Sequence, residues 1–198
     1  MKPIQTLRSE EQGFVLVTSL MLIALISLAG ISAVDISTSE IQTATNDVHH
    51  KITFYSAEGG LDVGCEMLEQ NICCPTGFTP DEAGGDEATI SNIRVMELAF
   101  WKNSAALEPS DMSRDLYFPF DYGAGTHTNL GIGGSTVQGI GSALQMAAGY
   151  EGKGKGAAGG GAYLLYDIHS QHLGRGNSLS EVKIQWRHMI GQEEACRY

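Results

Sequence analysis

An uncharged apolar run of 21 residues, from Phe14 to Val34, constrains this chain more than any other feature. Its only polar side chains are small hydroxyls, and at about 1.5 Å per residue it forms a helix of roughly 31 Å, enough to cross a bilayer core. We therefore predict a transmembrane helix over residues 14–34. A cleaved secretory signal is the alternative, but the run is longer than a usual signal core, and Glu10 and Glu11 stand where a signal carries positive charge.

Apolar residues continue at helical spacing after this run. Their gaps of 3, 4, 6 and 7 residues fit a period of 3.6 and not the period of 2 of a strand. The residues are Ile41, Val48, Ile52, Tyr55, Leu61, Cys65, Leu68 and Ile72. Because no proline lies between Pro3 and Pro75, we expect one helix from Phe14 to Ile72. Gly59 and Gly60 are expected to soften it, since glycine within a helix costs about 1 kcal/mol relative to alanine.

The composition changes after the expected helix. Proline ends the helix at Pro75, and the acidic, glycine-rich residues 81–87 predict a loop. Short runs rich in aromatic and β-branched residues follow at 89–101, 115–122, 162–169 and 180–188, with a helical turn as an alternative over 95–101. In the last run Val182, Ile184 and Trp186 alternate with polar residues, as in a half-buried antiparallel strand. Residues 173–178 predict the loop of a hairpin.

A glycine-rich stretch over residues 123–161 holds 14 glycines. Because glycine loses much backbone entropy on ordering, we expect this stretch to be a long surface excursion. Two chance-like matches to nucleotide-binding motifs occur in it, at residues 149–156 and 154–159. The first has Gly156 where a P-loop needs Ser or Thr, and neither lies between a strand and a helix, so we predict no nucleotide site. The formal net charge of −11 also disfavours nucleic acid as a partner.

No arrangement of titratable residues predicts an enzyme or a cofactor. The six histidines form no catalytic set, no nucleophile elbow is present, and the acidic loop lacks the spacing of a calcium-binding EF-hand. All four cysteines follow the apolar run, on the side that would be exported, so disulfides are expected, with three possible pairings. They are Cys65, Cys73, Cys74 and Cys196. A zinc site is disfavoured because no C-x-x-C pair or matching histidine spacing occurs.

The N-terminal part of the chain resembles the type IV pilin family, and more specifically the PilX-like minor pilins. The resemblance rests on a short polar leader ending in Gly13, on the apolar opening of the helix at Phe14, and on residues 39–46 and 53–61. It implies that a prepilin peptidase cuts after Gly13 and that the new N-terminal Phe14 is methylated. It implies an α+β fold in which a long N-terminal α-helix packs against a small antiparallel β-sheet.

The resemblance also divides the chain. It implies a leader over residues 1–13, a transmembrane and filament-core helix over 14–34, and an amphipathic extension over 35–72. Residues 73–198 would form a β-rich periplasmic or extracellular region containing the excursion. We expect Cys73 or Cys74 to bond to Cys196, because pilins often close a C-terminal loop this way, and the other to bond to Cys65.

Thr18 departs from the pattern of most major pilins, which carry a glutamate at the matching position. That carboxylate neutralises the N-terminal amine of a neighbouring subunit inside the filament, where an unpaired charge costs several kcal/mol. A subunit without it suits the filament tip, and PilX-like pilins and GspK-like pseudopilins share its absence. The alternative is that Thr18 is merely a tolerated small residue.

The function implied is that of a minor pilin in a tip complex that primes pilus assembly. Its partners would be other minor and major pilins, a PilY-type tip adhesin and the prepilin peptidase. It would stand in the inner membrane before assembly, with its C-terminal region in the periplasm, and on the pilus afterwards. The alternatives are a type II secretion pseudopilin and a membrane-anchored binding protein that does not polymerise.

Overall fold

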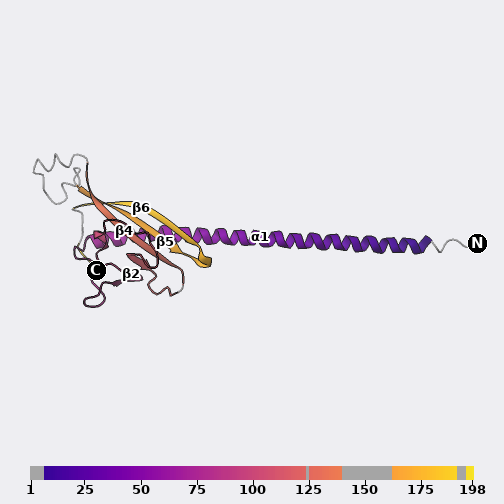
Figure 1. Cartoon of the computed structure of the whole chain (residues 1–198), viewed down its shortest axis with the longest axis horizontal. Coiled ribbons are helices and arrows are strands. Elements are labelled where there is room, and N and C mark those ends of the chain that lie inside the picture. Colours follow the sequence, from indigo (N-terminus) through magenta and orange to yellow (C-terminus); the bar gives the residue numbers. More distant parts are fainter. Residues whose placement is uncertain (1–6, 124, 140–161, 191–194) are drawn as a thin grey trace, which may run out of the picture. The chain divides into compact units, whose positions relative to one another are not determined.

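The computed structural model describes residues 7–123, 125–139, 162–190 and 195–198, with side chains from Gly13 onward. The chain divides into two units, residues 1–48 and residues 49–198. One α-helix, α1 (Leu7–Ile72), is followed by strands and two short 3₁₀ helices (Figure 1). The strands are β1 (Ala88–Ile90), β2 (Ile93–Val95), β3 (Leu116–Phe118), β4 (His127–Gln138), β5 (Ala162–Leu173) and β6 (Leu179–Met189). The 3₁₀ helices are η1 (Phe100–Lys102) and η2 (Arg175–Asn177).

The six strands form one antiparallel sheet in the order β1-β2-β3-β4-β5-β6, so each strand pairs with the next one along the chain. Such neighbouring pairs need only short connections. The longest ladders are β4 with β5, from His127↔Leu173 to Gln138↔Ala162, and β5 with β6, from Leu173↔Leu179 to Tyr163↔Met189. A long helix with an antiparallel sheet confirms the predicted α+β class.

Helix α1 ends at Ile72, as the sequence predicts, but begins at Leu7, within the expected leader. The buried Asn71 side chain then fixes the chain that follows. Its Nδ2 donates to the Leu98 carbonyl at 2.8 Å, and its Oδ1 accepts the Trp101 N–H at 3.0 Å. Because both polar atoms of this buried amide are satisfied, the segment before η1 is tied to the end of the helix.

The part of α1 in the second unit packs on the sheet through small residues. A Cβ at Gly60 would lie 2.3 Å from Ser170 Oγ and 2.8 Å from Thr128 Cγ2, and one at Gly64 would lie 2.9 Å from Ile168 Cγ2. Glycine therefore lets the helix and the sheet approach closely at these two positions. The expected softening of the helix does not describe Gly60, whose role is packing.

Strand β4 corrects the expectation of a surface excursion over residues 123–161. Residues 127–138 of that stretch form a central strand, while residues 140–161, with both nucleotide-motif matches, lie outside the described part of the chain. The backbone of residues 105–107 crosses the sheet here. A Cβ at Gly131 would lie 2.2 Å from the Leu107 oxygen, and one at Gly133 would lie 2.0 Å from the Ala105 carbonyl carbon. Glycine content in β4 thus reflects close packing and not a solvated loop.

The later strands match the predicted runs well. Strands β5 and β6 extend the two strongest runs and enclose η2, which lies in the predicted loop. The run at 89–101 is divided between two elements. Its first part forms the β1–β2 hairpin, as the strand interpretation predicts, and its last residues belong to η1, as the helical-turn interpretation predicts.

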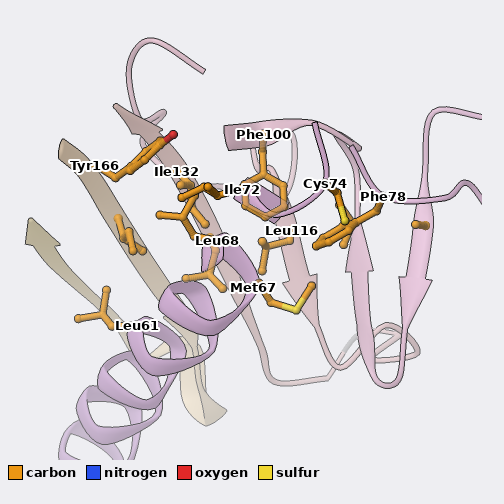
Figure 2. Packing of buried hydrophobic residues seen from close by; sticks show 14 residues of the cluster. Leu61, Met67, Leu68, Ile72, Cys74, Phe78, Phe100, Leu116, Ile132 and Tyr166 are labelled. Atoms are coloured by element: carbon orange, nitrogen blue, oxygen red, sulfur yellow. The ribbon is translucent and has the colours of Figure 1, made fainter. Parts of the chain in front are cut away.

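The hydrophobic core lies between the end of α1 and the sheet (Figure 2). Leu68 and Ile72 from the helix, Phe100 from η1, and Leu116 and Ile132 from the sheet are all buried within it. At about 25 cal/mol per Å² of apolar surface removed from water, a cluster of this kind is the main stabilising term of the second unit.

Candidate functional site

Large apolar side chains cover the first unit of the chain. From Phe14 to Val34 each of them is 58–71% exposed, so nothing within this unit covers them. Among the described residues, α1 is the helix long and apolar enough to cross a membrane. Lipid or a partner subunit would remove this surface from water.

Hydroxyl groups on this helix are hydrogen-bonded to the helix itself. Ser27 donates to the Ile23 carbonyl at 2.8 Å, and Ser32 donates to the Leu28 carbonyl at 3.1 Å. Such bonds satisfy the hydroxyl donors, so these residues lower the cost of placing polar groups in hydrocarbon.

Thr18 uses its hydroxyl in the same way. Its Oγ1 lies 3.1 Å from the Phe14 carbonyl and 3.0 Å from the Val15 carbonyl, both within the same helix. A hydroxyl carries no charge with which to balance an amine, whichever group it contacts.

The predicted processing site, Gly13 and Phe14, lies in helical backbone. Outside the chain neighbours and the backbone of the same helix, no described atom lies within 4 Å of a Cβ built at Gly13, and the Phe14 side chain is 71% exposed. The bond between the two residues is therefore not covered by any described part of the chain.

Residues 53–61, which carry part of the family resemblance, form the start of the contact with the sheet. Ala57 and Gly60 are buried against it, whereas Glu58 and Gly59 are exposed. Thr53 is also buried, and its Oγ1 lies 2.7 Å from Ser178 Oγ in the β5–β6 connection. The small residues of this segment thus hold the helix on its own sheet.

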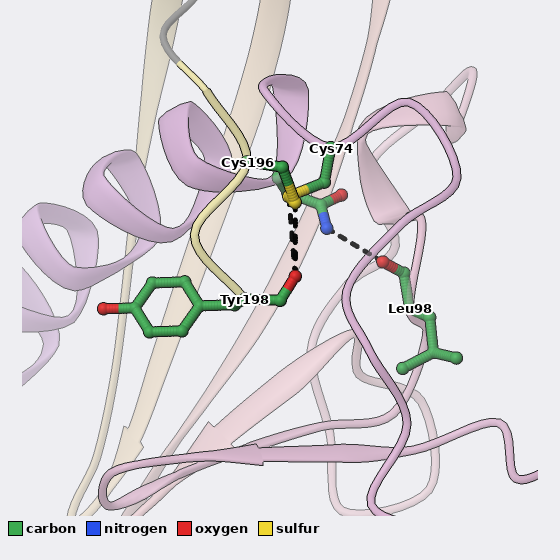
Figure 3. Close-up of a disulfide and its surroundings, with 5 residues drawn as sticks. Cys74, Leu98, Cys196 and Tyr198 are labelled. Atoms are coloured by element: carbon green, nitrogen blue, oxygen red, sulfur yellow. Dashed lines mark hydrogen bonds between the residues drawn. A yellow bond between two sulfur atoms is a disulfide. The ribbon is translucent and has the colours of Figure 1, made fainter. Parts of the chain in front are cut away.

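A disulfide joins Cys74, just after the helix, to Cys196 near the C-terminus (Figure 3). The two Cα atoms are 4.8 Å apart, within the usual range for a disulfide. The adjoining Tyr198 ring packs edge-on against Phe78, with centroids 5.9 Å apart. This is one of the pairings expected from the sequence, and it ties the C-terminal residues to the end of α1.

The second expected disulfide is absent, because Cys65 and Cys73 are both unbonded. They lie eight residues apart, and the helical bond from the Cys73 N–H to the Glu69 carbonyl continues the helix to Cys73. Eight residues rise about 12 Å along a helix, too far for a disulfide. Burial, with Asp62 and Glu69 nearby, raises the pKa of the Cys65 thiol.

Two histidines that stand alone in the sequence have carboxylate partners in the structure. His127 Nε2 lies 2.6 Å from Asp111 Oδ1, and His188 Nδ1 lies 2.8 Å from Glu69 Oε2. Hydrogen bonds from His127 and Asn129 lower the pKa of Asp111. Sequence spacing gave no signal for these pairs, since 16 residues separate Asp111 from His127 and the fold alone brings them together.

Asp111 and His127 line a cleft of about 830 Å³ at the η2 end of the sheet. The Tyr122 ring stacks on the His127 ring with centroids 3.8 Å apart, and Arg175 and Asn177 of η2 lie on the lining as well. Both imidazole nitrogens are engaged, because Nδ1 lies 3.1 Å from the Gly125 carbonyl. His127 is therefore not available as a general base.

Asp115 is a buried carboxylate that the sequence did not single out. Its Oδ2 accepts the Ile132 N–H at 2.6 Å, and its Oδ1 accepts from Asn103 Nδ2 at 3.0 Å. The side chain thereby satisfies the backbone of β4 where the short β3 no longer covers it. Burial, reinforced by the nearby Glu97, raises the pKa of Asp115 to about 6.

The acidic loop is internally paired. Asp81 accepts from the Thr89 N–H and Oγ1 at 2.8 Å each, and Arg94 forms ion pairs with both Asp81 and Glu87. These hydrogen bonds lower the pKa of Asp81. Within the described ranges, no group of three or more His, Cys, Asp or Glu side chains is placed to hold a metal ion.

Comparison with known proteins gives a match to one protein family. No curated protein and no solved structure matches the chain. Residues 12–62 match the family model described as PilX N-terminal, and this range includes the candidate processing site, the exposed apolar helix and the small residues at Ala57 and Gly60. An apolar anchor helix and an antiparallel sheet agree with that match. The chain therefore carries, over residues 12–62, a segment similar to the N-terminal part of the PilX family.

Proposed function

We propose that this protein is a minor pilin that takes part in type IV pilus assembly, within a tip complex that primes the filament. The observation that carries the proposal is the match of residues 12–62 to the PilX N-terminal family, over a helix whose apolar side chains are exposed from Phe14 to Val34. The proposed role is structural and not catalytic. Its partners are other minor pilins, major pilins and a PilY-type tip adhesin.

The proposal includes processing and location. Residues 14–34 anchor the precursor in the inner membrane, with residues 73–198 in the periplasm. A prepilin peptidase removes residues 1–13, and Phe14 becomes the methylated N-terminus. Assembly then replaces lipid contacts of the apolar helix by contacts with other pilin helices, which small residues such as Ala24 and Gly30 favour.

Thr18 supports a place at the tip. Inside a filament the N-terminal amine of a neighbouring subunit needs a counter-charge, and a threonine hydroxyl bonded to its own helix supplies none. A tip subunit lacks one neighbour, so the missing carboxylate costs least there.

Mass spectrometry of the N-terminal peptide tests the proposal. Protein is recovered from its native cells, with and without active prepilin peptidase. We expect a peptide that starts at N-methylated Phe14 and disappears without the peptidase. An intact leader, or a start near Val34, would contradict the pilin function and favour an anchored or secreted binding protein.

A deletion strain separates the two machines that use such proteins. Loss of surface pili with intact protein secretion supports the pilus function. Loss of secretion with intact pili would instead favour the pseudopilin alternative, which Thr18 alone does not exclude.

A further inference from the structure

The two edges of the sheet differ in length and regularity. At one edge β1 has only three residues. At the other edge β6 has 11 residues, and each of them pairs with β5 in a continuous register without a bulge. Within the described residues, β5 is the single strand neighbour of β6.

An edge of this kind exposes hydrogen-bonding groups. In an antiparallel pair, about half of the backbone N–H and C=O groups of an edge strand point away from its neighbour. Over residues 179–187 none of these groups bonds to the backbone of another described segment. Natural proteins block a long edge with proline, bulges, a very short strand or charged side chains. Of these, β6 has only charged side chains, and Lys183 and Arg187 lie on the sheet face opposite Ile184.

The side chains of β6 present different chemistry on its two faces. Val182 and Trp186 are half-buried on the face toward the helix, and Ile184 between them is 41% exposed. On the opposite face Lys183 and Arg187 are exposed. With Glu181 they give β6 a net charge of +1 in a chain of net charge −11.

We propose that the outer edge of β6 binds an extended segment of a partner subunit, which adds to the sheet as a seventh strand. The segment is apolar on the side next to Ile184 and acidic on the side next to Lys183 and Arg187. Main-chain hydrogen bonds would supply the affinity and these side chains the selectivity. The identification of the partner as a pilus subunit depends on the function proposed above.

A second copy of this chain fits the edge less well. Thr53 contacts Ser178 before β6 and Glu69 contacts His188 near its end, so β6 runs in the same direction as the helix. Two β6 strands paired antiparallel would set the two helices in opposite directions. Copies that share one orientation cannot pair in this way, which favours a strand from a different protein.

Peptide binding to the full chain in detergent micelles tests this inference. The probe is a short fluorescein-labelled peptide that alternates valine with glutamate. We expect it to bind, as measured by fluorescence anisotropy, and to slow hydrogen exchange at the outward amides of β6 by at least about tenfold. A peptide with lysine in place of glutamate should bind about tenfold more weakly. A peptide with methylated backbone nitrogens should not bind.

Two variants of the chain sharpen the test. The double substitution Lys183→Glu and Arg187→Glu changes exposed side chains only, and should make the lysine peptide the better ligand. Ile184→Lys places a charge on the pairing edge and should abolish binding. Met112→Lys adds the same charge at a fully exposed position outside the strands of the sheet, and this variant should bind the peptide like the wild type.

Three results would overturn the inference. The first is that the hydrogen exchange rates of the β6 amides do not change at saturating peptide. The second is that the methylated peptide binds as tightly as the unmethylated one. The third is that the β6 amides become protected without peptide as the protein concentration rises, which would assign the edge to a second copy. Pilus assembly in cells is a separate readout. If pili are lost when the whole gene is deleted but form normally with the Lys183→Glu and Arg187→Glu variant, the proposed function would stand and the role of the β6 edge would be contradicted.

Discussion

The buried carboxylate of Asp115 makes a sharp prediction about stability and pH. It accepts hydrogen bonds from the Ile132 N–H and from Asn103, but burial and the nearby Glu97 raise its pKa to about 6, from 3.8 in the unfolded chain. Between these values the folded protein binds more protons than the unfolded chain. Stability should therefore fall as the pH rises through this interval and level off above it.

The size of the effect follows from the pKa difference. A change from 3.8 to about 6 corresponds to about 3 kcal/mol, since each unit is worth about 1.36 kcal/mol. The variant Asp115→Asn removes this dependence, because asparagine does not titrate. At pH 4 the carboxyl of the unfolded chain is already more than half ionised. The free energy of unfolding of the wild type, minus that of the variant, should thus decrease by about 2.4 kcal/mol between pH 4 and pH 7. The absolute stability of the variant at one pH is not the test. Its amide NH₂ replaces one of two accepting oxygens and would face a donor, either Asn103 Nδ2 or the Ile132 N–H.

Urea unfolding of the full chain in detergent micelles measures this difference. Tryptophan fluorescence from Trp101 and Trp186 reports on the second unit, and the disulfide stays oxidised throughout. Asp81→Asn is the matched control, because the pKa of Asp81 is lowered by its hydrogen bonds. Asp81 therefore stabilises the wild type at higher pH, and that contribution is lost as the pH falls through its folded pKa. Parallel curves for the wild type and Asp115→Asn, within about 1 kcal/mol, would refute the reasoning.

Two further predictions concern the attachment of the helix. Gly60→Ala should destabilise the second unit by about 1–3 kcal/mol, because its Cβ would meet Ser170 and Thr128. A Cβ at Gly59 would meet no described atom within 4 Å outside its own helix and chain neighbours, so Gly59→Ala should be neutral or stabilising in the same unfolding assay. Replacing Cys74 and Cys196 together by alanine should lower the free energy of unfolding by up to about 5 kcal/mol, as expected for a cross-link across 122 residues. A loss below about 1 kcal/mol in urea unfolding would contradict that account.

Local patterns in the sequence were sufficient to predict the helix and the last two strands, but not strand β4 or the contacts between the elements. The helix end at Ile72 followed from Pro75 and the change of composition, and β6 followed from the alternation of Val182, Ile184 and Trp186. Glycine was misleading in β4, because its abundance at Gly131 and neighbouring positions predicts a loop in an isolated segment. The strand forms because the crossing backbone of residues 105–107 leaves no room for a Cβ, and that contact is non-local.

Polar pairs were the features least accessible from sequence. Asp111 and His127, or Glu69 and His188, have no characteristic spacing, since the sheet and the helix bring them together after folding. Asp115 gave no signal either, because a buried aspartate that satisfies a strand edge has the same local sequence as one in an exposed turn. Such residues become recognisable only when the burial and the hydrogen-bond partners are known.

The apolar stripe predicted along the helix separates into two parts with different environments. Leu61 and Leu68 are buried by the sheet, whereas Ile52 and Tyr55 remain 56% and 66% exposed although they continue the same periodic pattern. Periodicity measures which face is apolar, but it carries no information on whether the same chain or another one covers that face. This exposed continuation of a buried stripe lies within the residues that match the PilX N-terminal model, and the proposed assembly would remove it from water. The same reasoning applies to Ile184 on β6, which fits the strand pattern but remains exposed. Apolar residues of this kind, which fit the sequence pattern but are not buried by their own chain, are the strongest candidates for contacts with other proteins.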